Sequence, residues 1–248
     1  MTQDHVAKLM RGMRLLIIGK YDFVIVRDNA YLAVFFLLIS IFLRFKSVFW
    51  VSILMGDLYL IDAEKRKMYI RKWYAMLYKK IERFAIKFSD LIIAQSEAMS
   101  EYILNEICIM GGVISAPMGV DEELISGFEG VEVVKGSIGY LGSVDVSRNI
   151  PFLLDMFVLI RTDVKYENIT FKIIGGSQNI QTVNWLQQEI KCRNIEDLVI
   201  FTGQLDREDA WKELSSCDVC ISYIPRTLVF DLSSPTKLIE YLALGKKT

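Results

Sequence analysis

Short apolar runs alternate with helical stretches along the chain, and this alternation limits the fold more than any other feature of the sequence. The strand-like runs lie at Phe23–Val26, Val48–Ile53, Leu91–Ala94, Val113–Ser115, Ser137–Leu141, Thr170–Ile174, Leu198–Phe201 and Val219–Ser222. Strands that are apolar throughout, with helices between them, are typical of parallel sheets covered on both faces. The pattern pauses once, between Pro117 and Lys135. We therefore predict two doubly wound α/β domains, at residues 1–118 and 119–248.

Composition removes several classes of function. The formal net charge of the 248 residues is −1, which argues against a general nucleic-acid binder, although residues 1–117 carry about +5 and the remainder about −6. The single histidine, His5, precedes the folded pattern, so Ser-His-Asp and Cys-His mechanisms are excluded. The cysteines, whose spacing fits neither a disulfide framework nor a metal site, are Cys108, Cys192, Cys217 and Cys220. We expect no metal, and a reducing cytoplasm.

The stretch SSPTKLIEYLALGK, Ser233–Lys246, combines a helix start with two charged residues one turn apart. Pro235 suits the first helical position, and the free N–H groups of that turn favour an anion. Lys237 adds a cation, and Glu240 follows on nearly the same face. A carboxylate beside a phosphate site is expected where hydroxyl groups of a ribose must be bound. The pattern therefore predicts a site for a nucleotide carrying a sugar.

Glycines and polar residues follow three of the strands in the second half. Gly142 and Ser143 follow the first, Gly176 follows the second and Gly203 follows the third. The carboxyl ends of parallel strands share one edge, where such folds bind ligands, and glycines let a backbone approach closely. Arg148, just before an apolar helix, could reach a diphosphate at that edge. We expect these residues to line one site.

The chain also resembles a known family. The segments IGYLGSVDVSRNIPFLLDMF, FKIIGGSQ, VIFTGQLDREDAWKELSSCDVCISYIP and P-x-K-L-x-E-Y-x-A-x-G-K are similar to the donor domain of retaining family-4 glycosyltransferases of the GT-B fold. YDFVIVRD, SDLIIAQSEAMSEYI and PMGVD resemble their acceptor domain and linker. The resemblance implies two Rossmann-like domains, both incomplete: the family's first strand and loop are replaced by a helical stretch at Val6–Ile18, and its closing helix is absent.

The resemblance implies a role for each candidate residue. Arg148 and Lys237 are the expected catalytic cations, and no cofactor is implied. The donor, a nucleotide diphosphate sugar, would be bound by Gly142, Ser143, Arg148, Gly176, Gly203, Ser234, Thr236, Lys237 and Glu240. A glycan or lipid-linked acceptor, as in polysaccharide biosynthesis, would face Arg27, Asp28, Ser52 and Asp57. The first two follow one strand and the last two follow the next.

Two segments bear on membranes. Tyr31–Leu43 is apolar but shorter than the roughly 20 residues that span a bilayer, so we expect a buried helix. Glu64–Phe88 carries nine cations and two anions interleaved with aromatic residues. Such a helix binds anionic membrane surfaces, or it docks on the sheet with its cations merely solvated. The first reading predicts a cytoplasmic protein that is peripheral at the inner face of the membrane.

The sequence is compatible with two functions and argues against a third. The first is transfer of a sugar from a nucleotide diphosphate sugar to a hydroxyl acceptor, with the activity of this chain left open. The second is a catalytically impaired relative that binds nucleotide sugars or acts as a scaffold. The third, a nucleotide-sugar epimerase, requires acid and base groups that this nearly histidine-free chain does not offer.

Overall fold

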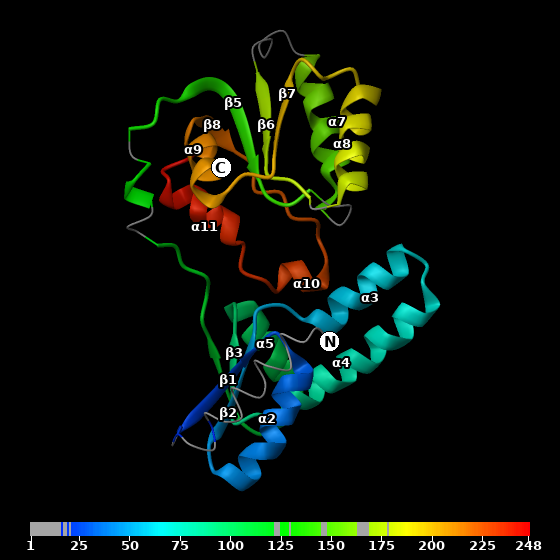
Figure 1. The fold of residues 1–248 in the computed structure, drawn as a ribbon, viewed down its shortest axis with the longest axis vertical. Coiled ribbons are helices and arrows are strands. Elements are labelled where there is room, and N and C mark those ends of the chain that lie inside the picture. Colours follow the sequence, from blue (N-terminus) through cyan, green and yellow to red (C-terminus); the bar gives the residue numbers. More distant parts are fainter. Residues whose placement is uncertain are drawn as a thin grey trace. The chain divides into compact units, whose positions relative to one another are not determined.

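The computed structural model describes residues 16, 19, 21–121, 125–128, 130–144, 148–162, 169–177 and 179–248, so the predicted helix at Val6–Ile18 lies almost wholly outside the described residues. The chain divides into two compact units (Figure 1). The first contains Met1–Pro117 and Thr227–Ser234, and the second contains Met118–Arg226 and Pro235–Thr248. The segment Thr227–Ser234 thus folds with the first unit although its neighbours in sequence fold with the second.

The first unit is a parallel sheet of four strands in the order β1-β2-β3-β4. Its elements are β1 (Phe23–Arg27), α2 (Ala30–Leu43), β2 (Lys46–Val51), α3 (Met55–Lys65), α4 (Tyr69–Phe88), β3 (Leu91–Ala94), α5 (Glu97–Glu106), β4 (Gly112–Ser115) and the short α10 (Leu228–Asp231). Phe49 of β2 pairs with Val26 of β1 and with Ile92 of β3, and all three are buried. Each predicted strand of this unit is present.

The second unit is a parallel sheet in the order β7-β6-β5-β8. Its elements are β5 (Val134–Leu141), α7 (Ile150–Arg161), β6 (Thr170–Ile174), α8 (Ile180–Cys192), β7 (Val199–Gly203), α9 (Arg207–Ser215), β8 (Cys217–Cys220) and α11 (Thr236–Ala243). Figure 1 shows α7 and α8 on one side of this sheet and α9 and α11 on the other. Two core clusters correspond to these two sides, one around Phe157 and Phe171, the other around Leu214 and Tyr241.

Side-chain caps fix where several helices begin. Asn29, Ser96, Asn179 and Asp206 each accept a hydrogen bond from a backbone N–H in the first turn of the helix that follows. Such a cap stabilises a helix by about 1 kcal/mol, because it satisfies a donor that has no partner within the helix. Asn29, Ser96 and Asp206 come shortly after the ends of β1, β3 and β7, so these caps help to set the turns at the carboxyl edges of the sheets.

The burial predicted for Tyr31–Leu43 is wrong. Helix α2 covers this segment, but Ala30 and Ala33 are its buried residues, whereas Ile41 is 72% exposed and Phe42 82% exposed. The helix is apolar on all sides, so only one side can pack against the sheet. No helix in the described part of the chain is long and apolar enough to cross a membrane.

Two helix boundaries also differ from the predictions. The basic segment Glu64–Phe88 is not one helix: α3 ends at Lys65, Lys67 has φ +53°, and α4 begins at Tyr69. Pro235 is the N-cap of α11 rather than its first helical residue, with φ −77° and ψ 82°. The first turn of α11 therefore starts at Thr236, one residue later than expected.

Candidate functional site

The second unit contains a cavity of about 390 Å³ at the carboxyl ends of β5, β6 and β7. Its floor comes from the loops after these strands, and its wall comes from α9 and α11. The lining residues are Leu141, Gly142, Ser143, Ile174, Gly175, Gly176, Gln204, Leu205, Asp206, Arg207, Ala210, Trp211 and Glu240. Ligands of doubly wound folds bind at this edge of the sheet.

The floor is built from backbone segments in contact. A Cβ on Gly175 would lie 2.4 Å from the carbonyl oxygen of Gly142, and a Cβ on Gly176 would lie 2.8 Å from the backbone nitrogen of Gln204. Backbone hydrogen bonds hold the same loops together: Gly142 donates to Ile174 at 2.9 Å, and Val144 donates to Gly176 at 3.0 Å. Only glycine permits this packing, which brings backbone groups to the surface of the cavity.

Lys237 lies against the floor from the first turn of α11. Its ammonium is 4.6 Å from the centre of the Tyr140 ring and donates a hydrogen bond of 3.3 Å to the Tyr140 hydroxyl. It also fills the space beside Gly142, where a Cβ would lie 1.8 Å from Nζ. The N-terminus of a helix carries partial positive charge, so the Lys237 ammonium is unfavourable there by itself. A bound anion would be attracted by both the helix N-terminus and the ammonium.

Glu240 lines the cavity one turn after Lys237 and is half-buried. Burial raises the pKa of its carboxyl above the usual value, while the positive charges of Arg207 and Lys237 oppose that rise. The Glu240 carboxyl of the cavity therefore lies within reach of the positive charges of Arg207 and Lys237. Such a group can accept hydrogen bonds from hydroxyl groups of a ligand.

Arg207 and Trp211 are cavity residues that the sequence analysis missed. Arg207 is the first residue of α9, and its guanidinium carbon lies 5.0 Å from the centre of the Trp211 ring. Asp206 caps the same helix by accepting a hydrogen bond from Asp209 N–H at 2.9 Å. The sequence LDRED has the features of a helix start and comes shortly after the third strand of the unit. This pattern could have indicated that Arg207 lies at the carboxyl edge of the sheet.

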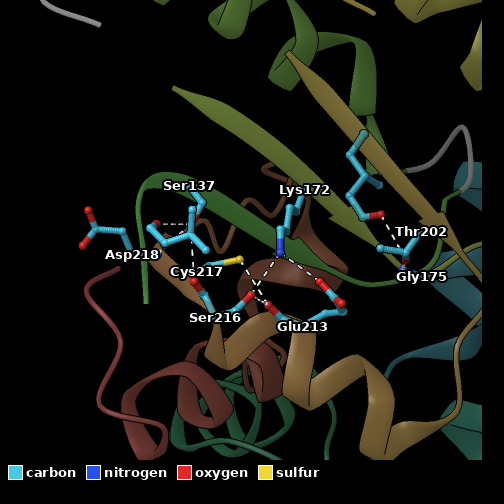
Figure 2. A network of polar contacts seen from close by, with 10 residues as sticks. Ser137, Lys172, Gly175, Thr202, Glu213, Ser216, Cys217 and Asp218 are labelled. Atoms are coloured by element: carbon cyan, nitrogen blue, oxygen red, sulfur yellow. Dashed lines mark hydrogen bonds and ion pairs between the residues drawn. The ribbon is translucent and has the colours of Figure 1, made fainter. Parts of the chain in front are cut away.

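A polar network fixes the other end of α9. Figure 2 shows the Lys172 ammonium between Glu213 and Ser216, to which it donates at 2.9 and 3.0 Å. Ser137 accepts from the N–H of Asp218 at 3.2 Å beside it. The Lys172 side chain is only 14% exposed, so the pair with Glu213 is partly shielded from water. The network holds α9 against the sheet, and α9 in turn forms a wall of the cavity.

The structure brings together part of the predicted donor set. Gly142, Ser143, Gly176 and Glu240 line the cavity, and Lys237 adjoins Gly142. Gly203 ends β7 with φ +72° and forms a bridge to Gly175. Besides Gly203 and Lys237, three predicted donor residues are not among the lining residues: Arg148 begins the short turn before α7, Ser234 folds with the first unit, and Thr236 opens α11. The roles of all these residues stay predictions.

Three of the four residues predicted for the acceptor lie together in the first unit. Arg27 Nε donates to Ser52 Oγ at 2.9 Å, and the Ser52 N–H donates to Asp28 Oδ1 at 2.7 Å. Asp28 has φ +54°, in the left-handed region that a non-glycine residue seldom adopts. Asp57 lies in the first turn of α3, which follows β2, and forms an ion pair of 2.5 Å with Lys79. Strain held at the end of a strand is typical of a functional position.

A buried carboxyl lies next to these residues. Glu82 of α4 is 2% exposed and accepts hydrogen bonds from the backbone N–H groups of Met55 at 2.9 Å and Gly56 at 3.0 Å, at the start of α3. Burial raises its pKa to about 7, and the negative charges of Asp57 and Asp28 add to the rise. The two N–H groups act in the opposite direction because they favour the carboxylate.

The two cysteines of β8 do not add a reactive thiol to the second unit. Cys217 and Cys220 are buried, and burial raises the pKa of both thiols, that of Cys220 to about 12. Both are therefore protonated at neutral pH and unreactive. The described residues contain no group of three or more His, Cys, Asp or Glu side chains arranged to hold a metal ion.

Comparison with known proteins identifies the architecture. Residues 135–248 match the family described as Glycosyl transferases group 1. Over 94% of the chain, HepE of Anabaena, solved in complex with UDP, superimposes with a TM-score of 0.66 at 15% identity. Over 97%, sucrose-phosphate synthase of Thermosynechococcus elongatus superimposes with a TM-score of 0.70 at 16% identity. The chain has the GT-B fold. The predicted pair of Rossmann-like halves is confirmed.

A further solved structure has the same fold. The E. coli protein described as trehalose-6-phosphate, bound with UDP-2-fluoro glucose, superimposes over 97% of this chain with a TM-score of 0.66 at 13% identity. The chain covers 61% of HepE, 58% of the synthase and 59% of the E. coli protein, so it spans about 60% of the length of these GT-B structures. None of the curated proteins matches it.

Proposed function

We propose that this GT-B protein is a glycosyltransferase that moves a sugar from a nucleotide diphosphate sugar to a glycan or lipid-linked hydroxyl acceptor, with retention of configuration, as in the family-4 enzymes that it resembles. One observation carries the proposal. Glu240 lines a cavity whose floor is backbone, and the ammonium of Lys237 lies against Gly142 of that floor, so a carboxylate, a cation and close backbone groups are gathered at one site. The match of residues 135–248 to group 1 glycosyl transferases supports it.

The diphosphate of the donor would lie at the start of α11. There the first-turn N–H groups of the helix and Lys237 offer donors and positive charge, and Gly142, Ser143 and Gly176 allow the backbone to approach. Arg148 would supply a second cation. Ser234 and Thr236, on either side of Pro235, would complete the turn around the phosphates.

Glu240 would bind the ribose. An ionised carboxylate only accepts hydrogen bonds, and the two hydroxyl groups of a ribose can donate to both of its oxygens. HepE has been solved with UDP and with UDP-glucose, which supports a nucleoside diphosphate sugar as the ligand class. Arg207 would keep Glu240 ionised while the ligand shields it from water.

The acceptor would be bound by the first unit. Arg27, Asp28 and Ser52 form a linked group at the carboxyl edge of its sheet, and Asp57 follows β2 at the same edge. Carboxylates and hydroxyls suit the hydroxyl groups of a glycan, because a carboxylate accepts hydrogen bonds from several hydroxyl groups and a hydroxyl both donates and accepts. Edge residues of this kind bind ligands in other doubly wound sheets.

Transfer would need no protein nucleophile. As the bond between the sugar and the diphosphate breaks, negative charge grows on the leaving phosphate, and Lys237 and Arg148 would stabilise it. The acceptor hydroxyl attacks the same face of the sugar and gives its proton to the leaving phosphate oxygen. Fixed charges that match the transition state are the largest source of catalysis in many enzymes. The reaction would take place in the cytoplasm.

Calorimetric titration with UDP and ADP tests the donor site. Lys237→Ala should weaken binding by about 2 kcal/mol, roughly 30-fold, because a hydrogen bond between charged groups is lost. Lys191→Ala, which removes an exposed lysine from α8, serves as the control and should bind as the unsubstituted chain does. Equal affinity in all three proteins would remove Lys237 from the site and with it the proposed donor pocket. Binding without sugar transfer would favour the alternative, a nucleotide-sugar-binding relative.

A further inference from the structure

Helix α4 is apolar on two opposite sides. Its core-facing side carries the buried residues Ala75, Tyr78, Glu82, Ala85 and Ile86. The other side carries exposed apolar residues at intervals that return to one stripe of a helix, namely Ile70, Trp73, Leu77, Phe84 and Phe88. One apolar side is enough to dock a helix on a sheet. The second stripe therefore has no part in the core of the unit.

The exposure is greatest at the turn between α3 and α4. These two helices form a hairpin, which Figure 1 shows in cyan. At its tip Met68 is 42% exposed, Tyr69 and Ile70 are each 87% exposed, and Trp73 on the next turn is 64% exposed. Large apolar side chains gathered this densely on a surface mark a site of interaction.

The same hairpin is strongly basic. Nine Lys and Arg residues lie between Lys65 and Lys87. Acidic side chains pair with four of them: Asp62 with Arg66 and Arg71, Glu64 with Lys72, and Asp57 with Lys79. Five have no carboxylate partner in the part of the chain that the structure describes, namely Lys65, Lys67, Lys80, Arg83 and Lys87. Lys80 and Lys87 lie on the apolar stripe itself.

We propose that the α3–α4 hairpin is a docking surface for an anionic lipid membrane. The stripe and the tip enter the interface, where tryptophan and tyrosine are favoured, and the five cations meet the lipid headgroups. A second copy of the chain is the poorer occupant, because two such stripes in contact would bring Lys80 and Lys87 against like charges. The proposal goes beyond the sugar-transfer function and does not depend on it.

Flotation with vesicles tests the proposal without any measurement of activity. The chain should float with vesicles of phosphatidylcholine that contain phosphatidylglycerol, and it should stay in solution with phosphatidylcholine alone. Added salt should release part of the bound protein, because salt screens the cations but affects apolar insertion much less.

Substitutions separate the contribution of apolar insertion from that of the cations. Replacing Ile70, Trp73 and Phe84 by Gln should lower the bound fraction at least tenfold at low salt. Lys80→Gln and Lys87→Gln should each lower vesicle affinity about fivefold. The matched control replaces three exposed apolar residues of the second unit, Phe152, Leu159 and Ile180, by Gln and should float normally.

Tryptophan fluorescence adds a readout of insertion. Vesicles should shift the emission of the chain to shorter wavelength, and Trp73→Phe should remove that shift while flotation persists, because phenylalanine still enters the lipid. Absence of flotation at low salt would overturn the proposal. So would a lipid-free dimer in analytical ultracentrifugation that the Gln substitutions at Ile70, Trp73 and Phe84 convert to monomer, since the stripe would then bind a second copy.

Discussion

The ammonium of Lys237 occupies the place where a side chain at Gly142 would begin. A Cβ added to Gly142 would lie 1.8 Å from Nζ and 2.6 Å from Cε of Lys237. The two residues are far apart in sequence, one after β5 and the other in α11, so the fold alone brings them together. The absence of a side chain at residue 142 thus decides where the cation of residue 237 lies.

Gly142→Ala should therefore behave like a substitution of Lys237. The end of a lysine side chain is flexible and can move away from the new methyl group. Gly142 has φ +159°, however, a backbone conformation that residues with a side chain rarely adopt, so the substitution should also lower the stability of the fold. Nucleoside diphosphate affinity should fall roughly 30-fold, as for the loss of one charge-assisted hydrogen bond. Calorimetric titration measures it.

A control and a double variant sharpen this prediction. Gly119→Ala adds a methyl group where nothing lies within 4 Å, and it should bind as the unsubstituted chain does. Adding Gly142→Ala to Lys237→Ala should cost little more than Lys237→Ala alone, because both act through the same ammonium. Additive losses would mean that Gly142 affects binding by another route.

Glu240→Gln should separate nucleoside from phosphate recognition. The proposed partners of Glu240 are ribose hydroxyls, and an amide offers one acceptor oxygen in place of two. Affinity for UDP should fall by about tenfold, while affinity for inorganic diphosphate should stay nearly unchanged. Competition between the two ligands, measured by calorimetry, gives both values. An equal loss for both ligands would mean that Glu240 supports α11 rather than the ribose.

The inner strands β2, β3 and β6 were predictable because residues on both of their faces are largely buried, so each is mostly apolar. The predicted runs at Leu91–Ala94 and Thr170–Ile174 coincide with β3 and β6. Both are inner strands of their sheets, so their apolar runs begin and end where the strands do. The predicted burial of Phe42 was wrong for a different reason. Hydrophobicity predicts that a residue prefers burial, but not that the fold has a surface left to bury it against.

The site was predictable only where chemistry and position coincide in one segment. Lys237 and Glu240 are one turn apart, so their position on nearly the same face follows from the helix itself. Arg207 reaches the same cavity from α9, and no spacing in the sequence connects it with Glu240. The segment Thr227–Ser234 shows the same limit: Ser96 Oγ donates to the carbonyl of Leu232 at 2.5 Å, a contact between residues that local patterns cannot relate.

Arg207→Gln should change how donor binding depends on pH. The positive charge of Arg207 opposes the rise that burial imposes on the pKa of Glu240, so its removal should raise that pKa further. If ribose binding needs the carboxylate, UDP affinity should then begin to fall at a higher pH as the solution is acidified. Titrations over a range of pH give the midpoint. Lys212→Gln, on the same helix but exposed, is the control; an unchanged midpoint in Arg207→Gln would contradict the coupling.

The buried Glu82 should make the first unit less stable as the pH rises through neutrality. Its pKa is about 7 in the folded chain against an ordinary value of 4.5, so the folded state holds a proton that the unfolded state has lost. This stabilisation is complete below about pH 4.5 and is lost by about pH 7, and the difference in pKa corresponds to about 3 kcal/mol. Asp57, Asp28, Lys79, Tyr59 and Tyr78 surround the carboxyl and set the midpoint.

Glu82→Gln tests this dependence, because an amide does not titrate. Urea unfolding between pH 5 and 8 should show a stability that falls with pH in the unsubstituted chain and falls much less in the variant, so that the two curves approach one another or cross near neutral pH. At low pH the variant should be the less stable, because its amide oxygen cannot accept from both Met55 and Gly56 while its NH₂ group needs an acceptor of its own. Glu101→Gln, an exposed carboxylate of α5, is the control and should follow the unsubstituted chain at every pH. Parallel curves for Glu82→Gln and the unsubstituted chain would show that the two N–H groups at the start of α3 keep Glu82 ionised despite its burial.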